Sequence, residues 1–175
     1  MKKKQKIDMY IALFLIFIGV ILLLMPILGV TNLKWLSIGI FSLYTVLNII
    51  QFLLTKESKD YEGIHTAIAS LIVLIASIIF NPQNSPRTLA MLLMIWIVLM
   101  SLTKLKKADY YHDRKDRMWK YSALNLGLFI LSGILTSINL AYSNEVQIII
   151  LGFFMLIHGI LELFEPITKT LIAHS

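Results

Sequence analysis

The feature that most constrains the fold is a series of six apolar segments, each close to the length that crosses a lipid bilayer. The hydrocarbon core of a bilayer is about 30 Å thick and takes roughly 20 residues of α-helix to span. Backbone groups in lipid need hydrogen bonds within their own segment, so such segments fold as helices. The sequence therefore predicts an all-α integral membrane protein with six transmembrane helices. The predicted spans are 9–25, 33–55, 64–80, 88–103, 121–138 and 145–163.

Composition supports this class and excludes several chemistries. Hydrophobic residues make up 58% of the 175-residue chain, whereas soluble domains contain about 45–50%. Mean hydropathy is +0.79. Cysteine is absent, which excludes disulfides, thiolate catalysis and cysteine-based metal sites. The basic N-terminus resembles that of a signal peptide, but no small-residue cleavage site follows the apolar run. We therefore expect an uncleaved first span.

The cations orient the helices. Short basic connections resist translocation and stay in the cytoplasm, and the segment 104–120 carries seven Lys and Arg residues. With this segment inside, both termini are cytoplasmic, and the outer turns carry only Lys34 and Arg87. The inner segments carry the other cations: Lys2, Lys3, Lys4, Lys6, Lys56, Lys59, Lys104, Lys106, Lys107, Arg114, Lys115, Arg117, Lys120 and Lys169. This asymmetry predicts a multi-pass protein of the plasma membrane.

The basic residues also indicate a partner. Anionic lipids of the cytoplasmic leaflet attract basic segments next to membrane spans. We therefore expect the cytoplasmic face to contact anionic lipids, and we expect no nucleic-acid partner. A second copy of the chain or another membrane protein is the other expected type of partner.

The connections group the spans into pairs. The outer turns 26–32, 81–87 and 139–144 are short, whereas the inner connections are longer and charged. The pattern predicts three tandem helical hairpins, 9–55, 63–104 and 119–165, in a single membrane domain 1–175. Asn81 and Pro82 should end the third helix, and Pro166 should end the sixth.

A weak repeat accompanies these hairpins. The segments FIGVILLLMP (17–26), SLIVLIASIIFNP (70–82) and ILGFFMLIHGILELF (150–164) resemble units of the HdeD-like acid-resistance membrane proteins. That family is similar in size and has a glycine-bearing helix, a proline near the outer turn, and then a helix of the form G-x6-G. Gly152 and Gly159 match the last pattern.

The match to this family is incomplete. Val46 stands where Gly39 would have its second glycine, the second hairpin lacks the glycines, and the third lacks the proline. The resemblance implies an inner-membrane protein linked to stress or acid tolerance. Small residues let membrane helices approach closely, so we expect Gly19, Gly39, Gly152 and Gly159 to be helix-packing positions.

The sharpest polar group lies on the last helix. His158, Glu162 and Glu165 are spaced i, i+4 and i+7 and can share one face. Ionisable groups inside a membrane segment are costly and indicate an ion or proton path. The alternative is that the carboxylates reach the headgroup zone or pair with inner cations, while His158 is a neutral imidazole hydrogen-bonded between helices.

Other polar residues fall in stripes on the predicted helices. The second span has Ser37, Phe41, Tyr44, Asn48, Gln51 and Thr55, and shorter stripes occur on the third and fifth spans. Interhelical packing is the favoured role, because such residues hydrogen-bond across membrane helices. The functional alternative is a protonatable pocket in the inner half. Its candidate residues are Asn48, Gln51, His65, Asn125, His158, Glu162 and Glu165.

No motif predicts an enzyme. Asp109, His112, Asp113 and Asp116 are metal-ligand types at helical spacing, but the surrounding cations would repel a metal ion. No phosphate-binding loop, dinucleotide fingerprint, zinc-protease motif or nucleophile elbow is present. We therefore expect a non-enzymatic protein without a cofactor or metal site.

Two functions follow from the sequence. The first is a scaffolding or interaction role in stress or acid tolerance, through packed helices. The second is a small transporter or proton-coupled channel that uses the polar cluster. A lipid-modifying enzyme ranks third, because no nucleophile or metal set is visible. A scaffold predicts that Gly152 and Gly159 matter more than Glu162, and a transporter predicts the reverse and a cavity that reaches the middle of the membrane.

Overall fold

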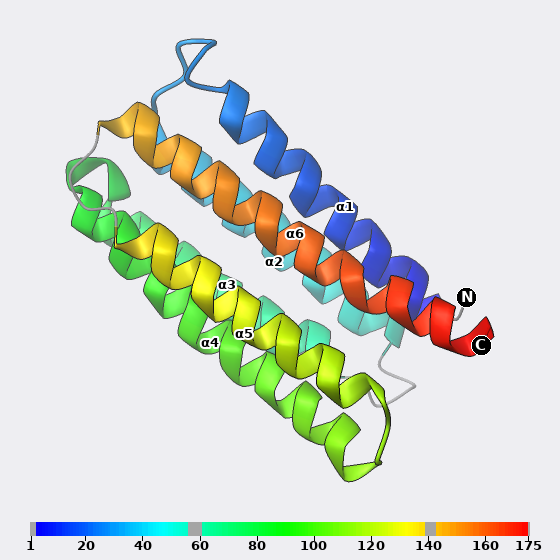
Figure 1. Ribbon diagram of the computed structural model, residues 1–175. Helices are drawn as coiled ribbons and strands as arrows, with labels where there is room; N and C mark the ends of the chain where they lie inside the picture. Colours follow the sequence, from blue (N-terminus) through cyan, green and yellow to red (C-terminus); the bar gives the residue numbers. More distant parts are fainter. Residues whose placement is uncertain (1–2, 56–60, 139–142, 175) are drawn as a thin grey trace.

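The computed structural model describes residues 3–55, 61–138 and 143–174, and within them it is all-helical (Figure 1). Within these residues, six α-helices are each long and apolar enough to cross a membrane, which agrees with the number and approximate position of the predicted spans. Both termini lie at one end of the bundle, which we call the terminal end (Figure 1). The elements are α1 (Lys3–Leu24), α2 (Leu33–Thr55), α3 (Glu62–Phe80), η2 (Pro82–Asn84), α4 (Pro86–Asp113), α5 (Met118–Ser137) and α6 (Asn144–His174).

Local signals set several helix ends. Helix α3 ends at Phe80, as the Asn81-Pro82 pair predicted, and Asn81 has a positive φ of 35°. The next helix begins with Pro86, whose fixed φ suits a first helical position. The hydroxyl of Ser85 accepts a hydrogen bond from the Arg87 backbone N–H at 3.2 Å. These residues therefore make the turn between α3 and α4 compact.

The buried faces are more polar than the exposed ones. Ser37, Asn48 and Gln51 of the α2 stripe are buried, as are Ser70 and Ser77 of α3. Large apolar side chains on the opposite faces are exposed, with examples from all six described α-helices: Leu13, Phe17, Val46, Ile79, Val98, Leu135 and Ile160. A chain surrounded by lipid gains nothing from hiding apolar side chains, so polar groups take the interior, where they find partners.

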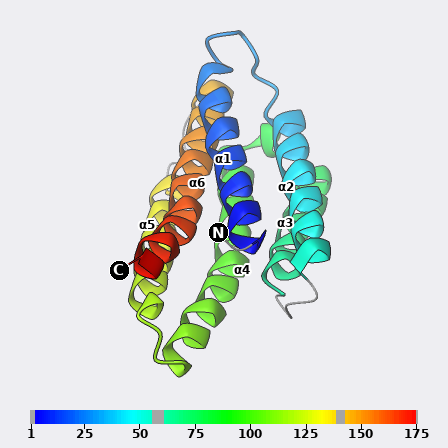
Figure 2. The same cartoon turned by 90° about the vertical axis from the view of Figure 1, so that its right-hand side faces the viewer.

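The closest helix contacts do not follow the expected hairpins. The most extensive contacts join α1 with α6, α2 with α3, and α4 with α5, and each of these pairs also touches a neighbouring pair. Figure 2 shows the α1–α6 pair and the α2–α3 pair on opposite sides of the bundle. The contact between α1 and α2, the two helices of the first expected hairpin, is less extensive. Partners in the bundle are therefore set by side-chain fit as well as by short turns.

Two predicted helix ends are wrong. Helix α4 has 28 residues and continues to Asp113, so the basic segment 104–120 is mostly helical, and only 114–117 connect α4 with α5. Its buried face runs on through Lys104 and Tyr111 without a glycine or proline break. Helix α6 likewise continues past Pro166 to His174. A proline removes one backbone hydrogen bond, but membrane helices tolerate this where neighbouring helices and side chains satisfy the freed group.

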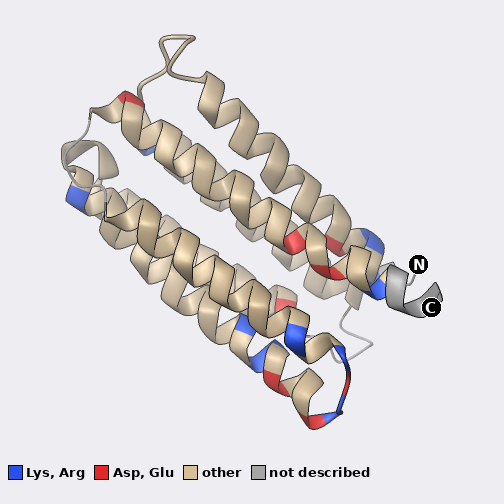
Figure 3. Ribbon diagram, viewed as in Figure 1, with Lys and Arg blue, Asp and Glu red and all other residues tan. Residues whose placement is uncertain are grey.

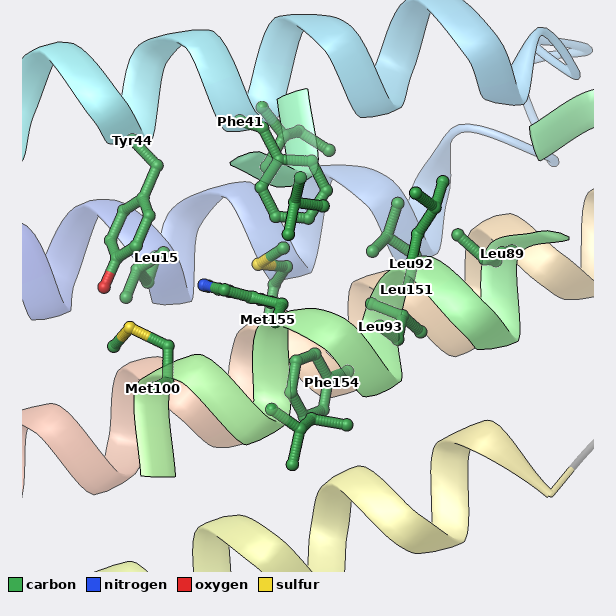
Figure 4. Packing of buried hydrophobic residues seen from close by; sticks show 14 of the residues in the cluster. Leu15, Phe41, Tyr44, Leu89, Leu92, Leu93, Met100, Leu151, Phe154 and Met155 are labelled. Atoms are coloured by element: carbon green, nitrogen blue, oxygen red, sulfur yellow. The ribbon is translucent and has the colours of Figure 1, made fainter. Parts of the chain in front are cut away.

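Large side chains fill the half of the bundle away from the termini. Trp96 is fully buried, with its ring centroid 5.1 Å from that of Phe41 and 5.5 Å from that of Phe154, both edge-on. Figure 4 shows Phe41, Leu92, Leu151, Phe154 and Met155 meeting in this region. All six described α-helices contribute to the buried apolar cluster, because Leu15 comes from α1, Val73 from α3 and Phe129 from α5. The interior is therefore closely packed here.

Candidate functional site: a charged cavity at the terminal end

A small cavity lies inside the bundle towards the terminal end. Its volume is ≈ 30 Å³, room for about two water molecules. Side chains of α1, α2, α3, α4 and α6 surround it. The lining residues are Asp8, Ile11, Tyr44, Asn48, Gln51, Glu62, Thr66, Met100, Thr103, Lys104, Lys107, Glu162, Glu165 and Pro166. Figure 3 shows that charged residues concentrate at this end of the helices. Charged side chains therefore make up much of the cavity lining.

Lys107 of α4 lies between two glutamates on different helices. Its ammonium forms ion pairs with Glu62 of α3 and, at 2.5 Å, with Glu165 of α6. Each glutamate has a second cation: Lys4 is 3.1 Å from Glu62, and Lys169 is 2.7 Å from Glu165. These contacts connect α1, α3, α4 and α6 in one network.

Lys104 makes a second ionic centre one turn deeper. It is 8% exposed, pairs with Glu162 of α6, and donates to Asn125 Oδ1 at 3.1 Å. The Asn125 amide in turn donates to the Leu161 carbonyl at 2.5 Å. The Lys104 ammonium also lies 5.1 Å from the centroid of the Phe129 ring. A buried charge is tolerated when it is paired and hydrogen-bonded, and Lys104 meets both conditions.

Asp8 of α1 has a different environment from the three glutamates. Its Oδ1 accepts a hydrogen bond from Gln51 Nε2 at 2.6 Å. Among the described residues, no lysine, arginine or histidine nitrogen lies within 4.0 Å of its carboxylate. Glu62, Glu162 and Glu165 each have at least one lysine at that range. In the cavity lining, the Asp8 carboxylate therefore has a hydrogen bond from an amide in place of an ion pair with a lysine.

His158 lies beyond the cavity, at the edge of the packed half. The Tyr44 hydroxyl is 3.3 Å from its Nε2, and Tyr44 also lines the cavity. Its Nδ1 has no hydrogen-bond partner among the described residues and lies 3.9 Å from a Glu162 oxygen. Aromatic rings enclose the imidazole, with the Phe129 centroid at 4.9 Å and the Trp96 centroid at 5.3 Å. The imidazole thus lies between the ionic cavity and the packed aromatic half.

The structure brings most of the predicted polar residues together. Asn48, Gln51, Glu162 and Glu165 line the cavity, Asn125 contacts it through Lys104, and His158 contacts it through Tyr44. His65 does not join them. It is exposed on α3, and its Nδ1 lies 2.7 Å from the Tyr61 carbonyl. The predicted inner-half cluster therefore forms without His65.

The four predicted helix-packing glycines fall into two groups. A Cβ on Gly159 would lie 2.7 Å from the Ile16 backbone nitrogen, and a Cβ on Gly152 would lie 2.8 Å from Leu22 Cβ. Gly19 faces the same junction, since a Cβ there would lie 2.6 Å from the Leu156 nitrogen. These three glycines let α1 and α6 approach closely.

Gly39 differs from the other three. Apart from its own helix backbone, no heavy atom of the described residues lies within 4 Å of the position of an added Cβ. Its helix, α2, therefore makes no close approach to a neighbouring helix at this point. Close approaches at glycines lie elsewhere: between α1 and α6, and between α3 and α2, where a Cβ on Gly63 would lie 2.8 Å from the Asn48 carbonyl oxygen.

Several site residues were not predicted. Glu62, Lys104, Lys107 and Tyr111 were assigned to polar connections, and Asp8 was left outside the first span. A signal for them was present in the sequence. The buried face of α4 includes Trp96, Met100, Lys104, Ala108 and Tyr111, which recur every three or four residues and so continue one helical face past the apolar segment.

No protein-family model, curated protein or solved structure matches the chain. The resemblance to the HdeD-like proteins therefore stays a prediction. Within residues 3–55, 61–138 and 143–174, no group of three or more His, Asp or Glu side chains is arranged to hold a metal ion.

Proposed function

We propose that the chain is a small transporter or proton-coupled channel of the plasma membrane, and that the charged cavity is one half of its path. In this proposal the terminal end faces the cytoplasm, as the distribution of Lys and Arg predicts. The observation that carries the proposal is the cavity itself. It gathers four carboxylates and two ammonium groups from four helices inside a bundle of apolar segments.

The cost of these charges is the main argument. Ionisable side chains inside membrane segments are rare, face the bundle interior and mark ion or proton paths. Helix association needs none of them, because small residues and neutral hydrogen bonds already drive it. In this chain Gly159 and Gly152 pack α6 against α1. A charged cavity is therefore a cost that a purely structural bundle would avoid.

The position of His158 extends the argument towards the middle of the membrane. Tyr44 joins the cavity to His158 through one hydrogen bond, and both residues can exchange protons. Trp96 and Phe154 pack against the imidazole on its far side. In this arrangement the cavity is the part of the path that water can enter, and His158 is the proton-exchanging side chain at its inner end. The aromatic rings of Trp96 and Phe154 close the space beyond it.

Proton flux into liposomes tests this function. The full chain is reconstituted with a pH-sensitive dye inside, a pH step is applied outside, and potassium with valinomycin fixes the membrane potential. We expect wild-type protein to carry protons faster than empty liposomes, and Glu162→Gln and His158→Asn each to remove most of this flux. The exposed aspartate variant Asp109→Asn is the matched control and should keep it. Wild-type flux equal to that of empty liposomes, or unchanged flux in both site variants, would refute the proposal.

A scaffolding role in stress or acid tolerance is the second proposal. The observation that favours it is the open space around Gly39 on α2, where a helix of a second copy of the chain can approach. Here Gly39→Leu should weaken co-purification of a tagged and an untagged copy, and should lower acid survival, while proton flux is unchanged. Unchanged association and survival would exclude this role for Gly39.

A further inference from the structure

Asp8 is the unusual carboxylate of the cavity. The three glutamates in the lining each have an ammonium partner, whereas Asp8 has the Gln51 amide at 2.6 Å. An unpaired carboxylate in a low-dielectric interior is costly unless a bound cation or a proton compensates its charge. Asp8 therefore requires a cation or a proton to compensate its charge, whereas the three glutamates already have lysines for this.

The charged groups around Asp8 favour this compensation. Lys4 precedes it by one turn on α1, α3 contributes Glu62, α4 contributes Lys104 and Lys107, and α6 contributes Glu162 and Glu165. The phenol of Tyr44 faces the same cavity from α2. Lys104 and Lys107 of the lining pair with its three glutamates, and Lys4 and Lys169 pair with two of the same glutamates. All four ammonium groups are thus engaged by glutamates, and a proton on Asp8 compensates the charge that none of them pairs with.

The cavity suits a proton better than a metal ion. Magnesium and calcium need six or more oxygen ligands, but the glutamates here are engaged by lysines. No group of three or more His, Asp or Glu side chains in the described part of the chain is arranged to hold a metal ion. Water fits in the ≈ 30 Å³ cavity and can deliver a proton.

We propose that Asp8 takes up and releases a proton from the cavity, as the first proton acceptor on the path from the terminal end. A hydronium ion in the cavity transfers its proton to the carboxylate and leaves water, and release reverses the step. The Tyr44 hydroxyl borders the same cavity and contacts His158, which gives the proton a next site. The use of this proton in transport rests on the proposed function, but its binding at Asp8 does not.

Infrared spectroscopy of the reconstituted full chain tests the binding directly. A protonated carboxylic acid has a C=O stretching band that disappears on ionisation. We expect one such band in the wild type, its intensity falling as pH rises. The band should be absent from Asp8→Asn, present in Asp8→Glu at a changed frequency, and unchanged in Asp109→Asn, a matched change at an exposed position on α4. A band that persists in folded Asp8→Asn overturns the proposal.

A measurement without substitution covers the case in which Asp8→Asn does not fold. Labelling the aspartate side-chain carboxyl carbons of the wild type with carbon-13 should lower the frequency of the band, because Asp8 lines the cavity while the other aspartates among the described residues, Asp109, Asp113 and Asp116, are exposed. A band that does not move belongs to a glutamate and overturns the assignment. A labelled band without proton flux refutes the transport function alone, and flux without a band refutes the role of Asp8 alone.

Discussion

The close approach of α1 and α6 at Gly159 gives a quantitative prediction. Gly159→Ala adds one methyl group, whose carbon would lie 2.7 Å from the Ile16 backbone nitrogen and 2.9 Å from the Ala12 carbonyl oxygen. Both atoms belong to the backbone of α1, so no rotamer change relieves the overlap. The two helices must separate locally by several tenths of an ångström, and the glycine contacts above and below are lost as they do.

The expected magnitude follows from two opposing terms. Overpacking a closely packed interior costs about 1–3 kcal/mol. Replacing glycine by alanine inside a helix gains about 1 kcal/mol from backbone propensity. Gly39→Ala has the same propensity gain but no overlap, since no heavy atom of a neighbouring described helix lies within 4 Å of its added Cβ. The difference between the two variants therefore isolates the overlap, and we expect Gly159→Ala to be less stable than Gly39→Ala by about 1–3 kcal/mol.

The assay is reversible unfolding in mixed micelles, with SDS as the denaturant and far-ultraviolet circular dichroism as the signal. The free energies of unfolding of both variants and the wild type are compared at one lipid and detergent composition. Adding Gly152→Ala, the next contact of α6 with α1, should lower stability further. Equal stability of Gly159→Ala and Gly39→Ala would show that α1 and α6 do not approach closely at Ala12 and Ile16, and would refute the α1–α6 pairing.

Two further predictions concern the ionic network and the orientation. Lys107→Met removes the ammonium that two glutamates share and should cost about 3–5 kcal/mol in the same unfolding assay, whereas Lys106→Met, next to it but exposed, should change stability by no more than about 0.5 kcal/mol. Alkaline phosphatase fused after Asn84 or Ser143 should be active outside the cytoplasm, and the same enzyme fused after Lys115 should be inactive. An inactive fusion after Asn84 and Ser143 would reverse the proposed orientation.

The spans were predictable because lipid imposes a simple rule on sequence. Each apolar segment is a long run with few or no charged residues, and the turn at Asn81-Pro82 has strong local signals. The stripe that includes Ser37, Asn48 and Gln51 also identified the buried face of α2, since a membrane protein reverses the usual relation between polarity and exposure. These features depend on neighbouring residues only, so the sequence carries them directly.

The pairing of α1 with α6 could not be predicted from neighbouring residues in the sequence. It depends on the fit between helices at opposite ends of the chain, where Gly159 meets Ile16. The short outer turns favoured neighbours in sequence, but a turn restrains only one end of each helix. Side-chain fit along the whole length then decides which helix lies closest.

Part of the site was predictable from the sequence, and the residues that were missed have one property in common. His158, Glu162 and Glu165 were found from helical spacing, whereas Lys104 and Lys107 were assigned to a loop because they are charged. Their ammonium groups lie next to carboxylates from other helices, and partners of this kind are invisible in a single segment. A charged residue at the end of an apolar run therefore marks a helix end only if no oppositely charged side chain inside the bundle can pair with it.

The buried face of α4 summarises how the two halves of the bundle differ. From Leu89 to Met100 it is apolar, and from Lys104 to Tyr111 it carries the charges. Trp96 lies at the boundary, where its Nε1, like Ser37 Oγ farther along, has no hydrogen-bond partner among the described residues. Unsatisfied buried polar atoms cost about 1–3 kcal/mol each, so the close packing of the half away from the termini lowers the stability of the fold at these two atoms.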